Sequence, residues 1–180
     1  MVMFDPAYAS ELDNPERRKA LPVKEILRYL MSLKVDRKVA VDVGAGTGYL
    51  TIPLSWVFRK VYAVEANPKM ARLLRKNLEE KGITNVEIIL SEKPPKLPER
   101  PNLVAFSLSL HEIENRRDYL RWALKADYVL IIEWCLNAGR GPPKEEKIPR
   151  EELLNMEGVE LVLSRVSFPY YLVILKRSKN

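Results

Sequence analysis

The stretch VAVDVGAGTG, residues 39–48, decides the fold of this chain. Its first half, Val39–Val43, is a β-branched apolar run typical of a buried strand. Its second half places glycines at the alternate positions Gly44, Gly46 and Gly48. Residues without a Cβ let the chain turn tightly and let a ligand approach the backbone. A helix that follows at once would present free N–H groups to that ligand. The stretch therefore predicts a strand, a ligand-binding loop and a helix in succession.

Strand-like and helix-like segments alternate around this unit. We expect strands at 39–43, 61–65, 86–90, 103–108, 128–133, 159–168 and 170–176, and helices at 21–33, 49–58, 67–81, 115–124 and 150–156. Alternation through the first five strands is typical of a parallel sheet with helices on both faces. The connection Phe168-Pro169-Tyr170 is too short for a parallel crossover. We therefore expect an α/β fold, with a doubly wound, mostly parallel seven-stranded sheet that ends in a C-terminal antiparallel hairpin.

The chain length suits one domain with a single sizeable core, because it has 180 residues. We expect a single domain over residues 1–180, in which 1–38 form a helical N-terminal segment and 39–180 form the core. Two proline-rich stretches, 93–101 and 139–143, are interpreted as connections inside this domain.

The composition excludes several classes of protein. The single cysteine, Cys135, cannot form an internal disulfide or by itself hold a structural zinc ion. No apolar run approaches the roughly 18–20 residues that span a bilayer, and the N-terminus lacks a basic region followed by an apolar stretch. We therefore expect a cytoplasmic protein without a metal or a membrane partner.

The charged residues leave a nucleic-acid partner open. The net charge is +6 and the sequence pI is about 9.4, which permits such a partner. The basic residues are interspersed with glutamates, however, a pattern more typical of solvated surfaces. Glutamine is absent, while Lys, Arg, Glu and Pro are abundant, and this usage favours a thermophilic, heat-adapted protein.

The spacing of the loop distinguishes between two classes of nucleotide ligand. Dinucleotide-binding loops need a third glycine three positions after the second, and Tyr49 occupies that place here. Asp42 lies two residues before Gly44, where it suits an ammonium group better than a pyrophosphate. Glu65 ends the next expected strand, 21 residues after Gly44, and its carboxylate can accept both hydroxyls of an adenosine ribose. A nucleoside with an amino-acid tail fits these charges.

The runs VDVGAGTGYLTIPLS and VYAVEANPKM resemble the first two motifs of the class I S-adenosylmethionine-dependent methyltransferases. The resemblance extends from about Leu21 to Arg177, and the family's fold has the strand order expected above. It implies S-adenosyl-L-methionine as the cofactor. It also implies a Rossmann-like core whose Asp42–Gly48 loop holds the methionine moiety, while Glu65 binds the ribose.

The resemblance extends to individual residues of the cofactor site. Ala66 would lie beside the adenine, either Ser91 or Glu92 would lie near the adenine amino group, and the segment from Ser107 to His111 would face the sulfonium. The complete set of expected cofactor-binding residues is Asp42, Gly44, Ala45, Gly46, Gly48, Glu65, Ala66, Ser91, Glu92 and Ser107. In small methyltransferases of this type the segment before the first strand commonly folds over the cofactor, so Tyr8, Arg17 and Arg18 are lid candidates. The alternative is a loosely ordered start that is capped by an exposed helix.

Methyl transfer needs a base only when the nucleophile arrives protonated and is a weak acid. His111, the one histidine, is the candidate catalytic base, although a surface or structural role is an alternative. Glu133 and Trp134 end the fifth expected strand and either orient a substrate or close the edge of the sheet. Cys135 is interpreted as a small buried apolar residue.

The methyl acceptor is expected to be a small molecule. Methyltransferases that act on adenine in nucleic acids carry an Asn/Asp-Pro-Pro-Tyr/Phe motif after the fourth strand, whereas this chain has Ser107-Leu108-Ser109-Leu110. The Leu-His pair that follows resembles the branch with small-molecule acceptors. Two alternatives stay open: methylation of tRNA or rRNA through a diffuse positive face, and cofactor binding without catalysis. A monomer and a homodimer are both compatible with the sequence.

Overall fold

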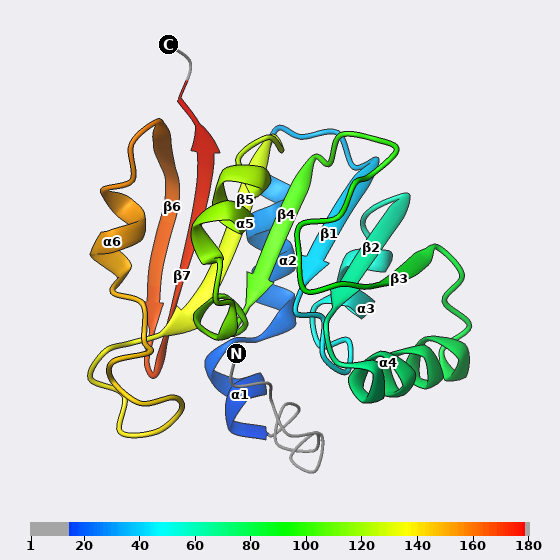
Figure 1. The fold of residues 1–180 in the computed structure, drawn as a ribbon, viewed down its shortest axis with the longest axis horizontal. Helices are drawn as coiled ribbons and strands as arrows, with labels where there is room; N and C mark the ends of the chain where they lie inside the picture. Colours follow the sequence, from blue (N-terminus) through cyan, green and yellow to red (C-terminus); the bar gives the residue numbers. More distant parts are fainter. Residues whose placement is uncertain (1–14, 179–180) are drawn as a thin grey trace.

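The computed structural model describes residues 15–178. Its centre is one sheet with the strand order β3-β2-β1-β4-β5-β7-β6 (Figure 1). The strands are β1 (Val39–Val43), β2 (Lys60–Glu65), β3 (Val86–Leu90), β4 (Leu103–Ser107), β5 (Tyr128–Trp134), β6 (Val159–Ser167) and β7 (Tyr170–Arg177). The first five strands pair in parallel, and β7 runs antiparallel to β5 and to β6. The doubly wound, mostly parallel seven-stranded sheet with a terminal antiparallel hairpin is thereby confirmed.

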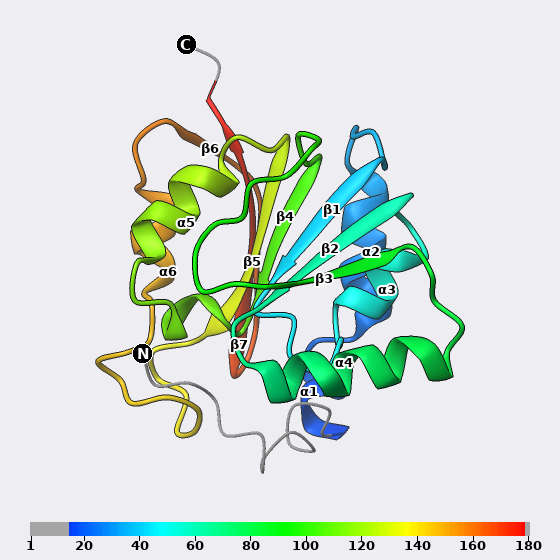
Figure 2. The same ribbon diagram turned by 45° about the vertical axis from the view of Figure 1, so that its right-hand side comes forward.

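Helices cover both faces of the sheet (Figure 2). They are α1 (Pro15–Ala20), α2 (Val23–Ser32), α3 (Thr51–Ser55), α4 (Pro68–Glu80), α5 (Arg116–Ala123) and α6 (Arg150–Leu154), with the 3₁₀-helix η2 at Leu110–Glu112. Within residues 15–178, no helix has the length and apolar character needed to cross a bilayer.

The alternation of side chains along β1 divides the core into two layers. Val39, Val41 and Val43 join the cluster that contains residues of α5 and α6. Ala40 joins the opposite cluster with residues of α2 and α3, and α4 packs on β2 on that same side of the sheet. All five β1 residues are buried on both faces, so the strand leading into the glycine loop is held rigidly.

The helix expected after β2 is confirmed as α4. The Asn67 side chain accepts hydrogen bonds from the N–H groups of Lys69 and Met70, and Pro68 takes the first helical position. Gly82 follows the helix with a φ of +64°. The helix expected at 49–58 is shorter, because the chain tightens into i→i+3 hydrogen bonds from Trp56 and Val57 to Pro53 and Leu54.

The strand order reverses at β1, which has β2 on one side and β4 on the other. Ligands of open α/β sheets bind outside the carboxyl ends of the strands at such a switch point. The loops after β1, β2 and β4 therefore meet where a ligand is expected.

Candidate functional site

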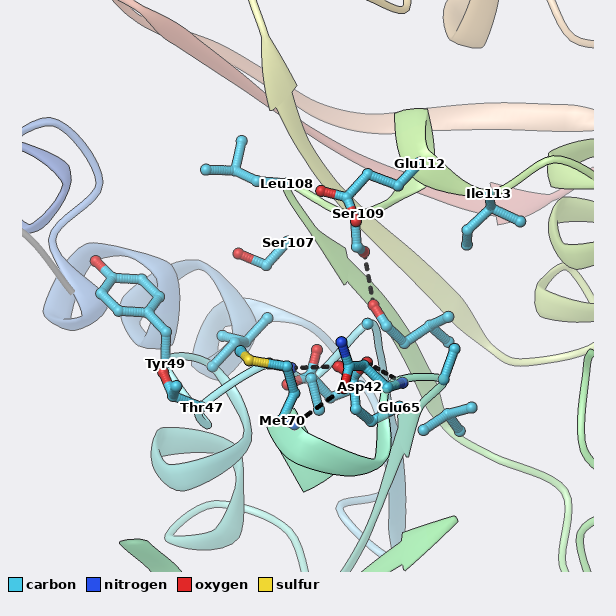
Figure 3. Close-up of a pocket in the computed structure, with 18 of the residues that line it drawn as sticks. Asp42, Thr47, Tyr49, Glu65, Met70, Ser107, Leu108, Ser109, Glu112 and Ile113 are labelled. Carbon is cyan, nitrogen blue, oxygen red and sulfur yellow. Dashed lines mark hydrogen bonds between the residues drawn. The ribbon is translucent and has the colours of Figure 1, made fainter. Parts of the chain in front are cut away.

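A cavity of about 890 Å³, including its open mouth, lies at the switch point. Figure 3 shows the segment after β4 on one side, with Ser107, Leu108, Ser109, Glu112 and Ile113, and the loops after β1 and β2 on the other. The lining residues that come from β1, β2, β3 and the segments after them are Asp42, Val43, Gly44, Ala45, Gly46, Thr47, Tyr49, Leu50, Val64, Glu65, Ala66, Asn67, Met70, Ser91 and Glu92. A cavity of this size accommodates a ligand of a few hundred daltons.

The glycine loop is fixed to β2 and to the segment after β4. The N–H groups of Gly44 and Ala45 donate to the carbonyl oxygen of Val64, at 2.8 and 3.1 Å. Gly44 has a φ of +70°, and a Cβ there would lie 2.3 Å from the Cβ of Ser109. The Ser109 hydroxyl in turn donates to the Val43 carbonyl at 2.6 Å. Glycine is therefore required at position 44 because two loops touch there.

Glu65 is held by the backbone on both sides of the cavity floor. Its Oε2 accepts the N–H of Gly46 and its Oε1 accepts the N–H of Asn67, both at 2.8 Å. A carboxylate offers about four lone-pair positions, so each oxygen keeps capacity for one more donor. The pair of oxygens is oriented to accept two neighbouring hydroxyl groups.

Asp42 is a buried carboxyl group in the lining of the cavity. It is fully buried, its Oδ2 accepts the Thr51 hydroxyl at 2.6 Å, and its Oδ1 has no hydrogen-bond partner. Burial raises the pKa of Asp42 to about 6, against the opposing effects of the Thr51 hydrogen bond and the charge of Arg17. A buried acceptor without a partner is costly, and a cationic donor from a ligand would remove that cost.

All the other expected cofactor residues except one line the cavity. Ala66, Ser91, Glu92 and Ser107 all line it. The Ser91 hydroxyl is engaged locally, since it donates to the Lys93 carbonyl and accepts the Lys93 N–H. Gly48 is the exception, because it faces α4, where a Cβ would lie 2.7 Å from Leu74 Cδ1.

His111 does not line the cavity, whereas its neighbour Glu112 does. Its Nδ1 is 2.8 Å from Oε2 of the fully buried Glu133, whose Oε1 also accepts the His111 N–H. Its Nε2 lies 3.8 Å from Glu112 Oε1. Glu112 is a lining residue, and burial raises its pKa to about 7 while the nearby His111 charge opposes the shift. Glu112 was not expected as a site residue from the sequence. Its position directly after the single histidine is the one feature of the sequence that could have indicated it.

Trp134 and Cys135, at and just after the end of β5, pack against neighbouring parts of the protein. The Trp134 ring packs against the Tyr170 ring in a tilted arrangement, with 4.6 Å between the centroids and 56° between the planes. It also covers Gly141, where a Cβ would lie 2.6 Å from the Trp134 ring. Cys135 is half-buried, and burial raises the pKa of its thiol. Within residues 15–178, no group of His, Cys, Asp and Glu side chains is arranged to hold a metal ion.

The N-terminal helix α1 brings one side chain into the cavity. Arg17 is buried and lines the cavity, whereas Arg18 is exposed. Tyr8, the third lid candidate, lies outside the described residues.

Comparison with known proteins shows which family the central part of the chain resembles. Residues 40–126 match the family model described as a methyltransferase domain. This stretch, just under half of the chain, is similar to methyltransferase domains. The match begins inside β1 and ends before β5, so it includes the glycine loop, Glu65 and the segment after β4.

Curated relatives match the chain over short stretches. A probable cobalt-precorrin-6B C(15)-methyltransferase (decarboxylating) of Sulfolobus acidocaldarius is 43% identical over 60 residues, which are 32% of this chain and 31% of that protein. A probable ribosomal RNA small subunit methyltransferase A of Methanosphaera stadtmanae is 35% identical over 54 residues, 30% of this chain and 20% of that protein. The matched stretches thus span less than a third of either relative.

A solved structure shares the fold of nearly the whole chain. A SAM-dependent methyltransferase from Aquifex aeolicus superimposes with a TM-score of 0.82 and 24% sequence identity, covering 96% of this chain and 98% of that one. This likeness supports the class I methyltransferase fold, including the C-terminal hairpin.

Proposed function

We propose that this chain is an S-adenosylmethionine-dependent methyltransferase that acts on a small-molecule acceptor. The observation that carries the proposal is the pairing of two carboxylates in one cavity. Asp42 offers a buried oxygen without a partner, and Glu65 offers two oriented oxygens on the other side of the glycine loop. An ammonium group and a ribose diol are the ligand groups that these two carboxylates fit.

Each expected cofactor residue has a proposed task in this cavity. Asp42 would hold the amino group of the methionine tail, and the Gly44–Gly46 backbone would lie against that tail. Glu65 would bind the ribose hydroxyls, Ala66 would contact the adenine, and Ser91 or Glu92 would meet the adenine amino group. S-adenosylmethionine, when bound, supplies a methyl group activated by a positively charged sulfur. The chain's own contribution is alignment of the acceptor and exclusion of water.

The wall after β4 is proposed to meet the acceptor. Leu108 and Ile113 give this wall an apolar surface, and Glu112 is its ionisable lining residue. An acceptor that arrives protonated would transfer its proton to Glu112, whose pKa near 7 suits a base at neutral pH. The catalytic role expected for His111 is therefore proposed to be indirect: His111 positions Glu112 and is itself anchored by Glu133.

Calorimetric titration with S-adenosylmethionine, S-adenosylhomocysteine, NAD and NADP in parallel tests the cofactor. We expect binding of the first two alone, with micromolar affinity. Binding of a nicotinamide cofactor instead would overturn the proposal. A protein that binds S-adenosylmethionine but releases no S-adenosylhomocysteine with any fraction of cell extract would be a cofactor-binding protein without catalysis.

Methylation of RNA is the second candidate, supported by the net charge of +6. Binding through phosphate contacts weakens steeply as the salt concentration rises, whereas acceptor binding in the cavity should change little between low and high salt. Methyl transfer to bulk tRNA or rRNA that disappears with added salt would favour this alternative over a small acceptor.

We also propose that the protein is cytoplasmic and heat-adapted. The support for heat adaptation is the absence of glutamine and the abundance of charged residues. Mesophilic domains commonly melt at about 45–65 °C, so a melting temperature above that range is the expected result, and one within it would contradict heat adaptation.

A further inference from the structure

Acidic side chains from several elements line the cavity, together with one positively charged side chain. Asp42, Glu65, Glu92 and Glu112 line it, and Arg17 is the single cationic side chain among the described lining residues. Arg17 belongs to α1, which precedes the sheet in the chain and is outside the part that matches the family model. A guanidinium that lines an acidic cavity is placed to meet an anionic group of a ligand as well as groups of the protein itself.

The structure fixes the position of the Arg17 guanidinium between two elements. Its Nη2 donates to the hydroxyl of Ser107, at the end of β4, at 3.1 Å. Its Cζ lies 4.2 Å from the centroid of the Tyr49 ring, directly after the glycine loop. The guanidinium is therefore at the same end of the cavity as Asp42, and its charge lowers the pKa of Asp42 against the effect of burial.

Three contacts hold α1 and the residue after it in place. The Tyr49 hydroxyl donates to the Leu21 carbonyl and the Ser167 hydroxyl donates to the Ala20 carbonyl, both at 2.6 Å. Glu16 pairs with Arg140 of the segment after β5. These contacts give the side chain of Arg17 a defined place, as recognition of a particular ligand group requires.

One end of the cavity thus offers the Asp42 carboxylate, with its unpartnered Oδ1, and the guanidinium of Arg17, whose charge acts on that carboxylate. An amino acid in its zwitterionic form carries the complementary pair of charges. Guanidinium groups bind carboxylates through paired, nearly parallel N–H···O bonds. We propose that Arg17 recognises the carboxylate of the amino-acid tail of S-adenosylmethionine, opposite the amino group held by Asp42. This inference rests on the proposed function and adds a residue outside the motifs.

Ligands that differ by one group test this assignment without an acceptor. Decarboxylated S-adenosylmethionine keeps the sulfonium and the amino group but lacks the carboxylate, and 5′-methylthioadenosine lacks the amino-acid tail. By calorimetry, the wild-type protein should bind S-adenosylmethionine about 10- to 100-fold more tightly than the decarboxylated form, the range expected for hydrogen bonds to a charged group. In Arg17→Met this preference should shrink to about threefold or less, with 5′-methylthioadenosine binding unchanged.

Two further variants separate recognition from folding. Lys19→Met removes the same charge from an exposed position of α1 and should keep the full preference. Arg17→Lys keeps the positive charge but lacks the paired N–H donors of the guanidinium, so its preference for S-adenosylmethionine should be intermediate. This variant provides the test if Arg17→Met does not fold.

The outcomes distinguish this inference from the function beneath it. An Arg17→Met protein that keeps the wild-type preference, or that loses 5′-methylthioadenosine to the same extent as S-adenosylmethionine, would overturn the assignment of Arg17 alone. A wild-type protein that binds none of the three nucleosides would overturn the proposed cofactor as well.

Discussion

The imidazole Nδ1 of His111 lies 2.8 Å from Oε2 of Glu133, a carboxylate with no solvent exposure. Burial disfavours the charged imidazolium, but the hydrogen bond and charge of Glu133, aided by Glu112 and Glu146, outweigh it and raise the pKa of His111 above its ordinary value. The pair links the end of β5 to the cavity wall after β4. It therefore stabilises the segment that carries Glu112.

Glu133→Gln should lower the pKa of His111, because the neutral amide removes the nearest negative charge. The chain has a single histidine, so one imidazole resonance, followed by NMR through a pH titration, reports this pKa directly. Glu157→Gln makes the same charge change at an exposed position and should leave the midpoint in place. Equal midpoints in wild type and Glu133→Gln would show that the pair does not control the protonation of His111.

Replacement of Glu65 by alanine should weaken S-adenosylmethionine binding by about 1.5–3 kcal/mol, the range for hydrogen bonds to a charged group. The change removes the proposed ribose acceptor and also leaves the N–H groups of Gly46 and Asn67 without their present acceptor. Calorimetric titration measures the loss. Glu87→Ala, which removes an exposed carboxylate paired with Lys60, should bind like wild type. Unchanged affinity in Glu65→Ala would mean that the ribose lies elsewhere.

The parts of the molecule that sequence predicts well depend on neighbours close along the chain. The glycine loop, the cap at Asn67 and the strands around β1 follow from local pattern, since each side chain acts within a few residues of its own position. The place of Glu65 at the end of β2 follows from strand length. This is why the strands, the helices and the glycine loop could be predicted from local pattern, whereas Ala66, Ser91, Glu92 and Ser107 were expected only from the resemblance to a family.

The parts that sequence predicts poorly depend on contacts between distant segments. Arg17 meets Ser107 across 90 residues, and no periodicity in α1 marks which of its basic residues turns inward. His111 and Glu112 are adjacent in sequence, yet only the packing of η2 against β5 determines that Glu112 lines the cavity while His111 turns towards Glu133. Tertiary packing, not residue type, selects between two such neighbours.

Asp42→Asn should stabilise the protein at pH 8 more than at pH 4. The folded carboxyl has a pKa of about 6 against 3.8 for an unperturbed one, so the native state takes up a proton that the unfolded state releases. The stability cost of ionising Asp42 is absent below pH 3.8, grows as the pH rises through the pKa of the folded state, and is complete above it. A shift of this size corresponds to about 3 kcal/mol at most.

Urea denaturation of wild type and Asp42→Asn at both pH values measures this cost. The asparagine amide packs in the same way at pH 4 and pH 8. The difference between the stability change caused by Asp42→Asn at pH 8 and at pH 4 therefore isolates the cost of ionising Asp42. Asp36→Asn, which changes an exposed carboxylate paired with Lys38, should show almost no such difference. A pH-independent effect of Asp42→Asn would contradict the raised pKa. The same variant should bind S-adenosylmethionine more weakly, because a neutral amide replaces the partner proposed for the amino group.

Gly44→Ala should destabilise the domain more than Gly82→Ala, although both glycines have a positive φ. Left-handed backbone costs an L-residue roughly 1–2 kcal/mol, and at Gly82 this is the whole cost, since no atom lies within 4 Å of an added Cβ. At Gly44 the new Cβ would lie 2.3 Å from Ser109 Cβ. Moving Ser109 aside would break its hydrogen bond to the Val43 carbonyl, so we expect about 1–3 kcal/mol more.

A double-mutant cycle with Ser109→Gly tests the cause of this extra cost. Removing the Ser109 side chain should relieve the collision, so Gly44→Ala should cost about as much in the Ser109→Gly background as Gly82→Ala costs in wild type. Urea denaturation of the four proteins gives the coupling energy. Equal losses from Gly44→Ala in both backgrounds would show that the backbone, rather than the contact between the two loops, requires glycine at position 44.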